Sequence, residues 1–112
     1  MAGALVNGAK VEITCKFYNN APTVFTFNNN NGVFASSVTG GDAGNFQGSL
    51  TVKDDFLDFK ATHWLDEDCN LEIYFYTNKN NYKYWTVHND AYNSHSVKVN
   101  DVDITTSLTR VN

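Results

Sequence analysis

Residues 69–77 alternate in a way that can build a binding surface. Their apolar positions share one parity, which predicts a strand with one buried face and sends Tyr74 and Tyr76 to the other face. Flat aromatic rings can lie against the C–H faces of pyranose sugars, and neighbouring carboxylates and amides can bind the hydroxyls. The pattern therefore favours carbohydrate binding. The candidate ligand-binding residues are Tyr74, Tyr76, Trp85, Trp64, Glu72, Asn70 and Lys83.

These residues lie together only if three consecutive strands pair in the right register. We expect residues 66–68 to turn the chain once and residues 78–81 to turn it again, with a hairpin on each side. The expected cross-strand pairs are Thr62 with Glu72, Lys60 with Tyr74, Tyr74 with Trp85, and Tyr76 with Lys83. In this register the tyrosines and tryptophans share one outward surface.

The aromatic surface has other interpretations. Tyr and Trp are also enriched at protein interfaces, so the same face can cover a second sheet, form a homodimer contact, or dock onto another protein as an interaction or inhibitor module. Glycans or glycoproteins are the expected partners of a carbohydrate-binding protein, and another protein is the expected partner of an interaction or inhibitor module. A homo-oligomer is expected for the carbohydrate-binding protein, because multivalency raises the avidity of weak sugar sites.

Acidic residues cluster at Asp54 and Asp55, at 66–68, and at Asp101 and Asp103. Calcium binds six to eight oxygens from such loops, but the spacing of an EF-hand is absent. Turn chemistry explains these clusters, since Asp favours turns. We predict no metal and no cofactor, and a weak calcium site at residues 66–68 stays open as an alternative.

The three histidines, His63, His88 and His95, are accompanied by no nucleophile motif such as GxSxG. The sequence therefore predicts a protein that is not an enzyme. The two cysteines, Cys15 and Cys69, are too few for a zinc site or a CxxC motif. They can form a disulfide in an oxidising compartment, or remain free thiols packed as small apolar side chains.

The elements that must position these residues are strands. Residues 10–17 alternate between polar and apolar side chains, which predicts a strand with one buried face. Similar short runs follow at 23–27, 33–39, 46–52, 56–65, 69–77, 82–87, 96–99 and 102–111, separated by Gly, Asn and Asp. Seven to nine short strands predict one all-β domain over residues 1–112, either an antiparallel β-sandwich or a small meander barrel.

Composition excludes several classes of function. With 42% hydrophobic and 18% charged residues the chain can form a core, and its net charge of −4 with scattered basic residues argues against nucleic-acid binding. The sequence shows no apolar run long enough for a membrane span and no signal peptide. We therefore expect no membrane insertion, and a protein that is cytoplasmic or secreted without a visible signal peptide.

In composition the chain is similar to small cytosolic lectins of fungi and microbes, since it is small, acidic and rich in Asn, Gly, Thr and aromatic residues. The resemblance implies a non-catalytic, lectin-like carbohydrate-binding protein. It is a likeness of composition, so no binding residues are transferred by it. Residues 25–52 also resemble calycin-type meander barrels, which implies a ligand inside the barrel as the alternative site.

Overall fold

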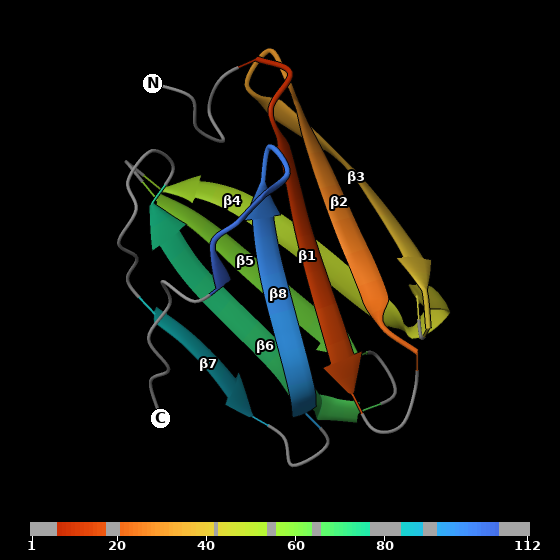
Figure 1. The fold of residues 1–112 in the computed structure, drawn as a ribbon. Helices are drawn as coiled ribbons and strands as arrows, with labels where there is room; N and C mark the ends of the chain where they lie inside the picture. Colours follow the sequence, from red (N-terminus) through yellow and green to blue (C-terminus); the bar gives the residue numbers. More distant parts are fainter. Residues whose placement is uncertain are drawn as a thin grey trace.

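The protein is a sandwich of two antiparallel β-sheets, as the computed structural model shows (Figure 1). The structure describes residues 7–17, 21–41, 43–53, 56–63, 66–76, 84–88 and 92–105. One sheet has the order β3-β2-β1-β8-β9 and the other β4-β5-β6-β7. Of the two expected all-β folds, the sandwich is confirmed and the meander barrel is wrong, since the described strands form two separate sheets. The strands are β1 (Lys10–Phe17), β2 (Thr23–Asn30), β3 (Val33–Gly40), β4 (Phe46–Lys53), β5 (Phe56–His63), β6 (Asp66–Tyr76), β7 (Tyr84–His88), β8 (Tyr92–Val99) and β9 (Val102–Asp103).

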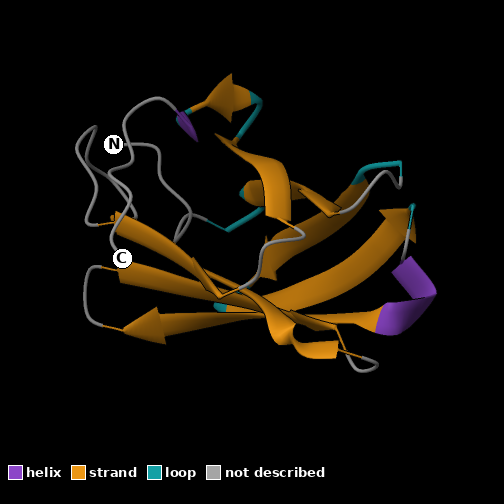
Figure 2. Ribbon diagram, turned by 90° about the horizontal axis from the view of Figure 1, so that it is seen from below, coloured by secondary structure: helices purple, strands orange, loops and turns teal. Residues whose placement is uncertain are grey.

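The core lies between the two sheets, which stack face to face when the molecule is viewed from below (Figure 2). Strands β1, β2, β5 and β6 each contribute every second residue to it, as alternation requires. Aromatic rings from both sheets meet there, with Phe25 and Phe59 centroids 5.2 Å apart and Phe27 and Phe59 centroids 5.9 Å apart. The buried cluster consists of Val11, Ile13, Cys15, Phe25, Phe27, Phe46, Leu57, Phe59, Ala61, Leu71, Ile73, Phe75 and Val97.

Two hairpins are closed by pairs of residues with positive φ. Asn31 (φ 55°) and Gly32 (φ 91°) connect β2 to β3, and Asn100 (φ 51°) and Asp101 (φ 68°) connect β8 to β9. Positive φ at both central residues matches the twist of antiparallel strands, and Asn, Asp and Gly tolerate it best. Of the asparagine run 28–31, only Asn31 lies in the turn, because the other three belong to β2.

The register between β5 and β6 differs from the expectation by two residues. Lys60 lies opposite Glu72, and Asp58 lies opposite Tyr74. An even difference leaves each side chain on its expected face. Its cause is an irregularity in β6, where extra residues follow Asp66 before the regular pairing resumes at Asn70. Residues 66–68 thus belong to β6, and the expected loop there is wrong.

The register between β6 and β7 differs by one residue, which matters more. Tyr74 lies opposite Tyr84, and Trp85 lies opposite Ile73, so the expected pairing of Tyr74 with Trp85 is wrong. The difference lies in the centre of the hairpin. The expected pairs are centred between residues 79 and 80, whereas the observed pairs are centred on residue 79.

Candidate functional site

The outer face of the four-stranded sheet carries part of the surface that the sequence predicts. Leu57, Phe59 and Ala61 point into the core, so the alternate positions of β5 face outward. Lys60 and Thr62 are exposed there, and Glu72 and Tyr74 of β6 are half-buried beside them. The structure therefore brings Glu72 and Tyr74 together on one face, and the cross-strand positions of Lys60 and Glu72 place opposite charges side by side.

Tyr74 packs against an aromatic residue of β5. Its ring lies edge-on to that of Phe56, with centroids 6.2 Å apart and an interplanar angle of 87°. Asp58, directly opposite Tyr74, is only 2% exposed although it belongs to the outer face. A ligand on this face can therefore contact Tyr74, but it cannot reach Asp58.

The other predicted site residues are not placed as side chains. Trp64 and Lys83 lie outside the described residues, and Asn70, Tyr76 and Trp85 are described by their backbone pairing alone. Their role as ligand-binding residues stays a prediction. Trp85 pairs with Ile73 and not with Tyr74, so the register does not bring these two aromatic residues together as expected.

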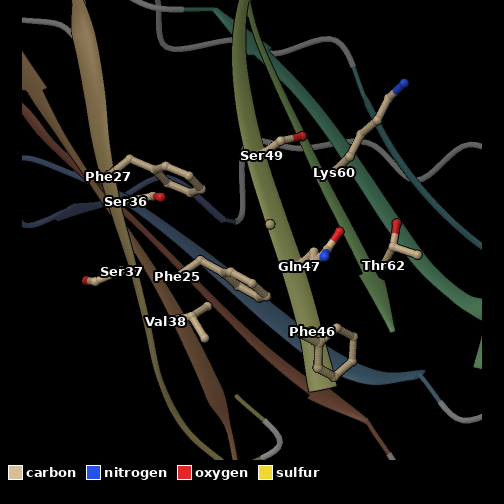
Figure 3. A pocket seen from close by; sticks show the side chains of 11 residues that line it. Phe25, Phe27, Ser36, Ser37, Val38, Phe46, Gln47, Ser49, Lys60 and Thr62 are labelled. Atoms are coloured by element: carbon tan, nitrogen blue, oxygen red, sulfur yellow. The ribbon is translucent and has the colours of Figure 1, made fainter. Parts of the chain in front are cut away.

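A groove of about 510 Å³ opens where edge strand β3 diverges from edge strand β4 (Figure 3). The buried rings of Phe25, Phe27 and Phe46 form its apolar base. Exposed polar side chains surround them, and Lys60 is the charged residue among them. The full lining is Phe25, Phe27, Ser36, Ser37, Val38, Phe46, Gln47, Gly48, Ser49, Lys60 and Thr62. The volume is within the range of small-molecule sites.

Gly48 of β4 lines the groove and leaves space for the ring of Phe25, which belongs to the apolar base. A Cβ at this position would lie 2.3 Å from Cδ1 and 2.6 Å from Cε1 of Phe25, so the phenylalanine ring occupies the space that a side chain would take. Lys60 and Thr62 complete the lining from β5, on the far side of β4 from β3, and the Lys60 side chain runs away from the phenylalanine rings (Figure 3). The groove is therefore continuous with the outer face that carries Glu72 and Tyr74.

Sequence reasoning missed the residues that β3 and β4 contribute to the groove. Ser36, Ser37, Gln47 and Ser49 are unremarkable strand residues in the sequence, and their grouping depends on two strands that share no hydrogen bonds. The available signal was Gly48, since a glycine inside a strand pattern often marks a close approach of another group.

Two titratable side chains lie opposite each other inside the sandwich. Burial raises the pKa of the Cys15 thiol to about 12, and Cys15 is a free thiol. His95 is its cross-strand partner on β8 and is half-buried, and burial lowers the pKa of its imidazole to about 4. A neutral, core-facing imidazole and an inert thiol are structural groups. The side chains of His63 and His88 are outside those that the structure describes.

The acidic residues near residue 100 have local structural roles. Lys10 Nζ lies 3.1 Å from Asp101 Oδ1, and this hydrogen bond, with the charges of Asp101 and Glu12, raises the pKa of the Lys10 ammonium. Asp103 Oδ1 accepts hydrogen bonds from the hydroxyl and the backbone N–H of Thr105, which lower its pKa. Turn chemistry thus accounts for Asp101 and Asp103, as expected.

No group of three or more metal-ligating side chains occurs within the described ranges. Asp54 and Asp55 lie outside these ranges, and the side chains of residues 66–68 are not described. Among the described residues no helix is long and apolar enough to cross a membrane.

Comparisons with protein families, with curated proteins and with solved structures found no match for this chain. By its fold and its groove, the protein is an antiparallel β-sandwich with an open groove between the edge strands of its two sheets.

Proposed function

We propose that this protein is a non-catalytic carbohydrate-binding protein and that a sugar binds in the groove between β3 and β4. The observation that supports the proposal is the lining of the groove, which combines an apolar base with several short hydroxyl and amide side chains. Ser36, Ser37, Ser49 and Thr62 each offer a donor and acceptor pair, and Gln47 adds an amide. A sugar ring presents the matching combination of C–H faces and hydroxyls.

The charges of the site favour a neutral sugar. Lys60 supplies an ammonium group at the rim, and Glu72 occupies the position directly opposite it on β6. Opposite charges at directly paired cross-strand positions partly offset each other, which leaves hydrogen bonding as the main polar interaction. Lys60 and Glu72 can then bind hydroxyl groups as donor and acceptor.

Tyr74 extends the site beyond the groove. It lies on the same outer face as Lys60 and Glu72 and is held by Phe56, so its ring can support a second sugar residue. Tyr76, Asn70, Trp64 and Lys83 remain candidates for this extension, whereas Trp85 pairs with core-facing Ile73 and is no longer one. The proposed site therefore runs from the groove toward β6.

A glycan-array screen of the labelled protein, with and without calcium, tests the proposal. Binding to a related group of neutral sugars supports it, whereas a blank array with protein shown to be folded by circular dichroism contradicts it. In the latter case the outer face is better explained as a protein interface.

Variants then locate the site on the molecule. Gln47→Ala and Lys60→Ala each remove one side chain from the groove, and each should weaken binding about fivefold, since a hydrogen bond contributes about 1 kcal/mol. Thr51→Ala is the matched control, because Thr51 is exposed on the same strand as Gln47 but does not line the groove. Calorimetric titration with the sugar found on the array measures these changes. Unchanged affinity in both groove variants places the site elsewhere.

A further inference from the structure

Strand β3 is an edge of its sheet in the part of the chain that the structure describes. It is hydrogen-bonded to β2 on one side, and its other side faces no strand among the described residues. All eight residues from Val33 to Gly40 pair with β2 without a register shift, so no bulge interrupts the edge. The strand contains no charged residue and no proline. Natural sheets normally protect their edges with such features, and a long regular edge without them can pair with another strand.

The side chains of β3 are open on both faces of the sheet. Six of its eight residues are exposed, including Val33 at 70%, and the other two, Phe34 and Val38, are half-buried. Phe34 and Val38 lie on the core-facing side, opposite Asn29 and Phe25 of β2. The strand thus presents unpaired backbone groups at its edge and two incompletely covered apolar side chains.

We propose that β3 pairs with β3 of a second copy of this protein, in an antiparallel arrangement around a two-fold axis. Such an axis must be perpendicular to the sheet, and it keeps the core-facing side chains of both copies on the same side. Residues that face each other across the axis then have the same parity. The axis therefore passes midway between the two copies of one residue. Near the middle of β3 this residue is Ser36 or Ser37.

The choice between these two registers follows from the side chains. With Ser36 on the axis, Phe34 of each copy lies opposite Val38 of the other, which forms two aromatic and β-branched pairs. With Ser37 on the axis, Phe34 lies opposite Gly40 and gains no side-chain partner. The first register covers both half-buried apolar residues, and the small Ala35, Ser36 and Ser37 at its centre permit close approach of the chains.

Charge permits this contact. Each copy has a net charge of −4, but the β3 edge has no charged side chain. The repelling charges of the two copies therefore lie away from the contact. Salt at about 0.1 M screens exposed charges that are more than about 10 Å apart. A single eight-residue strand contributes less surface than the roughly 1,600 Å² of a standard interface. We therefore expect a dimer that dissociates on dilution.

The dimer has a consequence for the groove, and this consequence alone rests on the proposed function. Ser36 and Val38 line the groove and also lie at or near the two-fold axis. Since the axis keeps the two four-stranded sheets on the same side, the two grooves face each other beneath the shared sheet. One glycan can then contact both sites, and the avidity exceeds that of a single groove.

Sedimentation velocity on the full chain without sugar tests the dimer independently of carbohydrate binding. The parent should show a sedimentation coefficient that rises with protein concentration. Ser36→Lys places two ammonium groups against each other at the axis, and this variant should stay monomeric. Thr51→Lys is the matched control, since it adds the same charge to an exposed position of edge strand β4. This control should dimerise like the parent.

A second variant keeps the proposal testable if Ser36→Lys fails to fold. Ser36→Cys should form a disulfide-linked dimer on mild oxidation, at a yield well above that of Ser37→Cys, because only the first places two cysteines opposite each other. The parent, with its own Cys15 and Cys69, gives the background. A parent that is monomeric at every concentration overturns the proposal. It is also overturned by a dimer that survives Ser36→Lys, or by higher cross-linking through Ser37→Cys.

Discussion

Acidification should destabilise this protein through His95. The residue lies on β8 opposite Cys15, next along the core-facing side from Val97, which is fully buried. Because burial disfavours the charged imidazolium, the pKa of His95 falls from 6.5 to about 4 in the folded protein. In the unfolded chain the imidazole is solvated and keeps its ordinary pKa.

The sign and size of the effect follow from this difference. Between pH 6.5 and pH 4 the unfolded chain binds a proton that the folded protein does not, so stability falls as the pH is lowered through this range. The two pKa values correspond to about 3 kcal/mol, at about 1.4 kcal/mol for each pH unit. Since His95 is only half-buried, solvent screening reduces the expected loss to about 2 kcal/mol.

Urea unfolding at pH 7 and at pH 4, followed by circular dichroism, measures the effect in the parent and in His95→Gln. Glutamine is polar and does not titrate, so the variant should lose about 2 kcal/mol less than the parent between the two pH values. His63, His88 and the carboxylates are present in both proteins and cancel in this comparison. An equal loss of stability in the two proteins would refute the reasoning, because some other group would then titrate.

Two further substitutions test the packing and the hydrogen bonds. Gly48→Ala should lower the free energy of unfolding by about 1–3 kcal/mol in urea titrations, because its Cβ meets the ring of Phe25, whereas Gly44→Ala, which meets nothing within 4 Å, should not. Thr105→Val should cost about 1–3 kcal/mol in the same assay, since the hydroxyl accepts a hydrogen bond of 2.8 Å from the N–H of fully buried Val97. Thr105→Ser keeps the hydroxyl, and equal losses in the serine and valine variants would contradict this role.

Local pattern was sufficient to predict the strands with the clearest alternation. In β1, alternation alone identified Val11, Ile13 and Cys15 as buried, and each is at most 1% exposed. The turn at Asn31 and Gly32 was also readable, because few residues tolerate positive φ there. The expected strand 102–111 is interrupted, since β9 ends at Asp103, whose side chain accepts hydrogen bonds from Thr105, and residues 106–111 lie outside the described residues.

The candidate site was only partly predictable. Glu72 and Tyr74 lie together on an outer face, as alternation within β6 requires. The pairing of Tyr74 with Trp85 was wrong, because it depended on the exact centre of the hairpin, and a register change of one residue moves a side chain to the opposite face. Alternation within one strand does not fix the register in which that strand pairs with its neighbour.

By itself, the sequence determined that the fold is all-β and which faces of its clearest strands are apolar. These properties depend on side chains a few positions apart. Only the tertiary structure decided that β1 lies between β2 and β8, that β3 and β4 are edges, and that a groove opens between them. Those features depend on contacts between distant segments, and in particular on Phe25 occupying the space that Gly48 leaves open in another sheet.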